Sequence, residues 1–141
     1  MTVLPRGGGR QFLGGGAQVK VESGAADFSV FEQQLPPGPS PVPLHVHDRY
    51  DEAFYVLDGE MHFVVGDTTS VAEVGAFVFV PRGEAHRFWN PSPTPARMLV
   101  IGSPQAQALV EELAPLLRST PPDAAAISAA FAKHHSRVVT M

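Results

Sequence analysis

Residues 38 to 52 read GPSPVPLHVHDRYDE, and this stretch does most to decide the fold. Side chains alternate between the two faces of a β-strand, so His45 and His47 point to one side while Val46 points to the other. After a break of four residues, Glu52 begins the run EAFYVL, whose β-branched and aromatic residues predict a new strand entering the same interior. The stretch therefore directs two imidazoles and one carboxylate toward a common centre.

A second stretch, GAFVFVPRGEAHRFWN at residues 75 to 90, supplies another histidine. It predicts a strand, a turn at Pro81 and Gly83, and a further strand that carries His86 on its inward side. Three imidazoles and one carboxylate then converge, as the ligands of a single metal ion do. The chain contains no cysteine, so its donors are nitrogen and oxygen, which suit borderline divalent metals.

Together the two stretches resemble the signatures of the cupin superfamily, G-x5/6-H-x-H-x3/4-E-x6-G and G-x5-P-x-G-x2-H-x3-N. A match at ten fixed positions with the right gaps is far more specific than one short motif. The matching positions are Gly38, His45, His47, Glu52 and Gly59, then Gly75, Pro81, Gly83, His86 and Asn90.

The resemblance implies an all-β fold: an antiparallel double-stranded β-helix (jelly-roll) barrel with one divalent metal ion inside, of Fe, Mn, Ni, Co, Cu or Zn. It assigns His45, His47, Glu52 and His86 as the metal ligands. The alternative is a barrel that has lost its metal or binds one only for stability. We favour metal binding, because buried histidine and glutamate side chains without a partner cost free energy.

Length and composition indicate one compact domain. A chain of 141 residues buries enough apolar surface to fold without disulfides, and 44% hydrophobic with 17% charged residues is ordinary for a globular protein. The net charge is −4 and the ten Lys and Arg residues are scattered singly, so we expect no nucleic acid partner. No apolar run of about 18 residues and no cleavable leader occur, so we expect a cytoplasmic protein without membrane contact.

Along the chain we expect three segments. Residues 1 to 17 contain two Gly-Gly-Gly runs and predict a flexible arm, because a phosphate-binding loop needs a following helix and the strand-like run QVKVE follows instead. Residues 18 to 102 predict the barrel, and residues 103 to 141 a C-terminal helical extension. Within the barrel, strands are expected at about 18–22, 28–35, 44–48, 52–58, 60–65, 69–74, 77–81, 85–90 and 96–102.

Two short helices are expected in the extension. Ser103 and Pro104 predict an N-cap and a first helical residue, and Pro115 should end or kink that helix. The run from Thr120 to Asp123 resembles a capping box that opens the second helix. These two helices either close the open end of the barrel or cover an outer sheet face, and we expect the second arrangement.

Asp58 and Gly59 stand between two apolar runs, which is the usual signal for a two-residue β-hairpin. Such a hairpin pairs Tyr55 with His62 and places both outside, which excludes His62 as a ligand. His134 and His135 are expected on a solvated face, with a role between subunits left open. The inward side chains near the metal predict an apolar pocket for a small-molecule substrate, formed by Phe54, Val56, Met61, Phe63 and Phe88.

The chain looks similar to the quercetin-dioxygenase-type cupins. That resemblance implies a metal-dependent dioxygenase acting on an enolic or aromatic hydrophobic substrate, with Glu52 both as a ligand and as the catalytic base. Two alternatives stay open: a non-redox isomerase, cyclase or lyase acting on a polyketide or keto acid, and a module that only binds a small molecule. A homodimer is expected, as is common among cupins.

Overall fold

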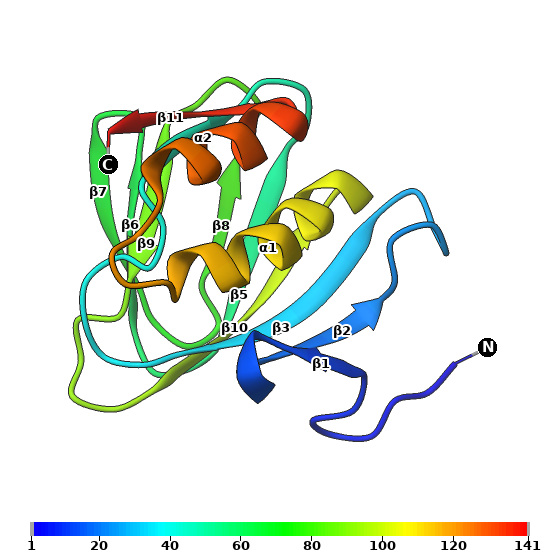
Figure 1. The fold of residues 1–141 in the computed structure, drawn as a ribbon. Coiled ribbons are helices and arrows are strands. Elements are labelled where there is room, and N and C mark those ends of the chain that lie inside the picture. The colour runs from blue at the N-terminus through cyan, green and yellow to red at the C-terminus, as the bar shows by residue number, and fades with distance from the viewer. Residues whose placement is uncertain (1, 141) are drawn as a thin grey trace.

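The computed structural model describes residues 2–140 and consists of two antiparallel β-sheets that face each other, with two helices along one side (Figure 1). One sheet has the order β1-β2-β3-β10-β5-β8, built from Arg10–Phe12, Ala17–Val21, Ser29–Leu35, Ala96–Gly102, Glu52–Asp58 and Phe77–Val80. The other has the order β11-β4-β9-β6-β7, built from Ser136–Thr140, Leu44–His47, His86–Trp89, Met61–Val65 and Thr68–Ala72. This is the predicted double-stranded β-helix, and all nine expected strands lie within two residues of their predicted bounds.

Alternation along the strands builds the core between the sheets. Phe54 of β5, Phe63 of β6 and Phe88 of β9 meet at its centre, with ring centroids 5.1 to 5.8 Å apart. These rings join strands of opposite sheets, so their burial holds the two layers together. Each fully buried side chain of this kind contributes about 1.5–3 kcal/mol through the hydrophobic effect.

The predicted hairpin at Asp58 and Gly59 is wrong. β5 pairs with β10 and β8, whereas β6 pairs with β9 and β7, so the turn carries the chain from one sheet to the other. Gly59 has φ 78°, and a Cβ there would lie 3.0 Å from the Cα of Ala96, so both conformation and space favour glycine. The predicted facing of the side chains is nevertheless right, because alternation within each strand sets it independently of the pairing partner.

Two strands were not predicted, one at each end of the chain. β1 lies within the segment expected to be a flexible arm; it pairs with β2 and leads into the short 3₁₀ helix η1 (Leu13–Gly15). β11 closes the segment expected to be helical, and it pairs with β4, which carries His45 and His47. The C-terminal residues therefore belong to the five-stranded sheet and reach the candidate site.

The helices are α1 (Pro104–Leu117) and α2 (Ala124–Lys133). Ser103 caps α1 as predicted, but α1 passes Pro115 and ends two residues later. The N-cap of α2 is Asp123, whose carboxylate accepts a hydrogen bond from the backbone N–H of Ala126.

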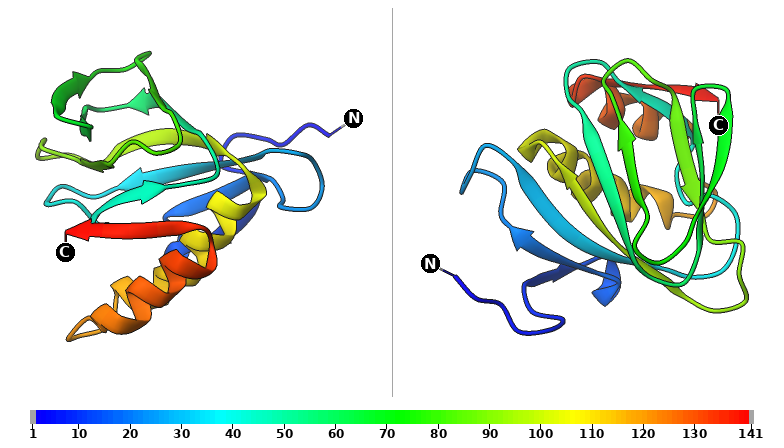
Figure 2. Two further views of the ribbon diagram at one scale, coloured as in Figure 1. Left: turned by 90° about the horizontal axis from the view of Figure 1, so that it is seen from above. Right: turned by 180° about the vertical axis from the view of Figure 1, so that it is seen from behind.

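The prediction that these helices cover an outer sheet face is wrong. They lie against the open side between the sheets, where α1 contacts β3 and α2 contacts β11 (Figure 2). Their apolar faces pack on each other through Leu109, Leu113, Ile127 and Phe131, and they close the barrel next to His45. No helix in the described part of the chain is long and apolar enough to cross a membrane.

Candidate metal centre

Four buried side chains from three strands meet inside the barrel. β4 supplies His45 and His47, Glu52 is the first residue of β5, and His86 is the first residue of β9, directly opposite His45 in the ladder. One donor atom from each of the four lies within 4.8 Å of the others. The four predicted ligands are thus brought together, and they are placed to hold one metal ion.

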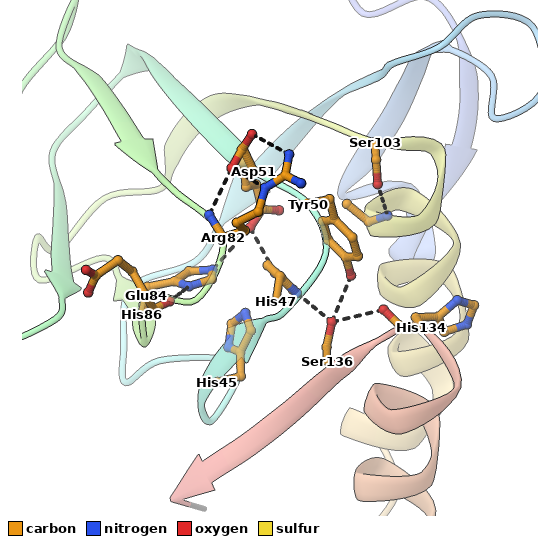
Figure 3. A network of polar contacts seen from close by, with 12 residues as sticks. His45, His47, Tyr50, Asp51, Arg82, Glu84, His86, Ser103, His134 and Ser136 are labelled. Carbon is orange, nitrogen blue, oxygen red and sulfur yellow. Dashed lines mark hydrogen bonds and ion pairs between the residues drawn. The ribbon is translucent and has the colours of Figure 1, made fainter.

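The ring orientations fit a metal centre. Nδ1 of His45 donates to the carbonyl of Pro43 at 2.7 Å, and Nδ1 of His86 lies 3.2 Å from the carbonyl of Glu84. With Nδ1 held by an acceptor, the lone pair of Nε2 is available to a metal, which is the arrangement that protein zinc and iron sites use. Figure 3 shows these rings turned toward a common centre.

His47 is oriented by a residue from the far end of the chain. Its Nδ1 donates to Oγ of Ser136 in β11 at 2.7 Å, and the Tyr50 hydroxyl donates to the same oxygen at 2.9 Å. Ser136 in turn donates to the carbonyl of His134 at 3.1 Å, so its one proton and two lone pairs are all used (Figure 3). Burial raises the pKa of Tyr50 to about 12, which keeps its hydroxyl protonated as the donor.

One carboxylate oxygen of Glu52 lies close to two imidazole nitrogens. Oε2 lies 3.1 Å from Nε2 of His47 and 3.1 Å from Nε2 of His86. Burial by itself raises the pKa of Glu52, but the hydrogen bonds and charges of the two histidines outweigh it and hold the pKa well below its usual range. For His45, burial and the charges of His86 and His47 lower the pKa to about 3. At neutral pH the site therefore presents an anionic carboxylate and a neutral His45, the forms that bind metal.

An ion pair fixes the second motif beside the first. Nε of Arg82 lies 3.2 Å from Oδ1 of Asp51, and Nη2 lies 3.0 Å from Oδ2 (Figure 3). The backbone N–H of Gly83 donates to the carbonyl of His47 at 2.9 Å. These contacts hold the turn that precedes His86 against the residues around Glu52.

A cavity of about 30 Å³, the inner cavity, adjoins His45, His47 and Glu52. Of the predicted pocket residues, Phe54 and Phe88 line it, whereas Val56, Met61 and Phe63 are buried in the core and do not. The two helices contribute walls that were not predicted to belong to the site. The lining consists of Phe31, Gln33, Val42, His45, His47, Glu52, Phe54, Phe88, Val100, Ala106, Leu109, Val110, Leu113 and Phe131.

A family model for the cupin domain matches residues 31–102, which is half of the chain. The chain belongs to the cupin family. A search of curated protein sequences found no significant match.

Several solved structures resemble part of this chain. The polyketide cyclase RemF from Streptomyces resistomycificus is 30% identical, with a TM-score of 0.55, over 62% of this chain and 63% of its own. A cupin-superfamily sugar phosphate isomerase from Silicibacter pomeroyi is 27% identical, with a TM-score of 0.54, over 62% of this chain and 59% of its own. A candidate sugar phosphate isomerase from Acidithiobacillus ferrooxidans is 28% identical, with a TM-score of 0.52, over 57% of this chain and 52% of its own. The chain thus spans between about half and two thirds of the length of these proteins.

The remaining histidines lie outside the cluster of four. His62 faces outward as predicted, with Nε2 3.2 Å from Oε1 of Glu60 and its ring against Trp89. His134 corrects the prediction of a solvated face: it is only 8% exposed, and its Nε2 lies 2.6 Å from Oε2 of Glu112. His134 is the C-cap of α2, and its ring lies against Glu112 of α1, a contact that was not predicted.

Proposed function

We propose that this cupin is a metal-dependent enzyme acting on a small, largely apolar substrate that carries an enol or an acidified C–H beside a carbonyl. The observation that carries the proposal is the composition of the inner cavity. Three of the four candidate ligands, His45, His47 and Glu52, open onto walls that are otherwise apolar, apart from Gln33. Apolar walls around one polar centre are typical of small-molecule sites.

His45, His47, Glu52 and His86 would hold one divalent ion. When bound, such an ion supplies Lewis acidity that lowers the pKa of a coordinated hydroxyl. Glu52 is our candidate base, because its carboxylate borders the inner cavity. The side chains of α1 and α2 exclude bulk water from that carboxylate.

For the reaction class, the first candidate is a dioxygenase acting on an enolic or aromatic hydrophobic substrate, by analogy with the quercetin-dioxygenase-type cupins. A second candidate is non-redox chemistry, as a cyclase, isomerase or lyase, and the likeness to the polyketide cyclase RemF favours it. A phosphorylated sugar suits the site less well, because the lining of the inner cavity includes no Lys or Arg.

Oxygen consumption tests the first candidate. The untagged protein, with its metal content measured, is given a panel of enolic aromatics and 1,3-diketones in an oxygen electrode, with product analysis in parallel. A dioxygenase consumes one O₂ per substrate transformed, whereas a cyclase or isomerase forms product without O₂. Absence of any product across the panel, with metal bound, would leave a cupin that only binds its ligand.

Glu52→Gln is the matched variant for the base. We expect it to retain part of the metal and to lose turnover, because an amide cannot take up the proton. Turnover per bound metal equal to that of the original protein would remove Glu52 as the base.

We also propose that the protein forms a homodimer through the outer face of its six-stranded sheet. β8 is an edge strand of that sheet, and Phe77 and Phe79 on it are 61% and 55% exposed. Tyr55 of β5 lies opposite Phe77 in the ladder and extends the apolar surface. Exposed apolar patches next to an open strand edge favour association.

A further inference from the structure

The inner cavity is too small to enclose an organic substrate by itself. Its volume of about 30 Å³ accommodates about two water molecules at roughly 10–15 Å³ each. A second cavity of about 240 Å³, the outer cavity, lies beside it between α1 and the segment before β4. Together they approach the lower end of the usual range for ligand pockets, roughly 300–1,000 Å³.

The two cavities share one wall. Its members are Gln33, Val42, Phe88, Val110 and Leu113, each of which lines both cavities. The two cavities are therefore neighbours on either side of the same five side chains. Along α1, Leu109 lines only the inner cavity and Arg118 only the outer, and nine residues of helix span about 13 Å.

Gln33 is the polar member of this shared wall. It lies on β3 opposite Met98 of β10, at an inward-facing position, and it is only partly buried. Its amide makes no hydrogen bond to residues 2–140 while facing both cavities. An amide in an apolar wall is suited to hydrogen-bond a carbonyl or hydroxyl of a ligand, and a ligand without that group would leave it unpaired.

Arg118 marks the far end of the outer cavity. It is the C-cap of α1, exposed to solvent, and it forms no ion pair within the described residues 2–140. The walls between Gln33 and Arg118 are mainly aliphatic, including Leu13 and Leu117. The outer cavity thus presents an apolar passage with a cation at its outer end.

We propose that the inner and outer cavities form one channel for an elongated apolar carboxylic acid, with its carboxylate at Arg118 and a carbonyl or hydroxyl at Gln33 beside the metal centre. This inference rests on the proposed function, since it names the substrate class for the same metal site. The two proposals can be tested separately, because binding to the channel is measured without turnover.

The test uses isothermal titration calorimetry of the full chain, as purified and with its metal content measured. The probes are 9-oxodecanoate, its methyl ester, which lacks the charge, and decanoate, which lacks the ketone. Arg118→Ala should weaken binding of 9-oxodecanoate up to about fivefold and leave the ester unchanged, as expected for an exposed ion pair. Gln33→Leu should weaken 9-oxodecanoate about fivefold and leave decanoate unchanged, as expected for one hydrogen bond.

Two further variants complete the design. Leu117→Trp fills the outer cavity without touching the inner one and should weaken all three probes more than tenfold. Arg137→Ala removes an exposed arginine that pairs with Asp48 elsewhere, and should change nothing. Equal affinity of the acid and the ester for the original protein, or indifference to Gln33→Leu, would overturn the inference. Turnover of a substrate without these dependences of binding would refute the channel but not the proposed enzyme. Binding with these dependences but without turnover of any substrate would refute the proposed enzyme but not the channel.

Discussion

His45 and His86 are each oriented by the carbonyl of the residue two positions earlier in the chain. His47 uses a hydroxyl 89 residues away instead. Local alternation was therefore enough to predict which way the ligand side chains face. Ser136 could not be predicted, because no motif links it to His47 and only the pairing of β11 with β4 brings it there.

The buried His45 makes the stability of the metal-free protein depend on pH. Its pKa is about 3 in the folded chain, against a reference value of 6.5 that applies to the unfolded chain. Between these values the unfolded state takes up a proton that the folded state does not, so the free energy of unfolding falls as the pH falls from about 6.5 toward 3. His45→Gln removes this contribution, and after chelation its stability should depend less steeply on pH.

Urea denaturation of both proteins at pH 7, 6 and 5 measures the difference. We expect the original protein to lose up to about 1.4 kcal/mol per pH unit more than the variant. Parallel pH profiles for the two proteins would show that His45 does not titrate as the geometry requires.

At the scale of elements, β11 completes the metal centre. Ser136→Ala removes the oxygen that accepts from Nδ1 of His47 and leaves the ring free to turn. We expect metal affinity to fall about 10- to 100-fold, the usual effect of losing a group that orients a ligand. Competition with a chelating dye measures it, and Ser128→Ala on the exposed face of α2 is the matched control. Equal affinities of the two variants would contradict this role of β11.

The helices act as a structural cover of the barrel opening. Phe131 of α2 is fully buried, and its ring lies 5.1 Å from that of His45. Phe131→Ala should lower the free energy of unfolding by about 3–5 kcal/mol. Val71→Ala, at an exposed position of β7, should change it by no more than about 0.5 kcal/mol. Similar midpoints in urea for the two variants would show that the helices are only loosely attached.

The element boundaries were predictable because strand and cap signals are local. The pairing partner of each strand could not be predicted. A turn such as Asp58-Gly59 has the same residue signature whether the next strand returns beside the first or crosses to the facing sheet. The position of the helices could not be predicted either, because an apolar stripe shows that a helix is covered but does not show which element covers it.

At the scale of the whole molecule, the exposed aromatic side chains on the six-stranded sheet carry the proposal of a homodimer. Replacing Phe77 and Phe79 together by Asp puts like charges on each copy of that face. Sedimentation velocity at several protein concentrations should show a dimer for the original chain and a monomer for the double variant. A monomer at every concentration for the original chain would refute the dimer.

The motifs predicted the centre of the molecule better than its periphery. The four candidate ligands and the rings of Phe54 and Phe88 lie where alternation put them. The inner cavity also depends on α1 and α2, which come after the barrel in the chain and fold back over it. Long-range packing of that kind leaves no local signature in the sequence.

The central claim is that His45, His47, Glu52 and His86 hold one metal ion. Its most direct test is elemental analysis of the untagged protein purified without chelator, together with His86→Gln and the matched His62→Gln. The account predicts about one equivalent of a divalent metal per chain in the original protein and in His62→Gln, and a large loss in His86→Gln. No metal in the original protein even after addition of divalent ions, or equal metal content in the two variants, would contradict it.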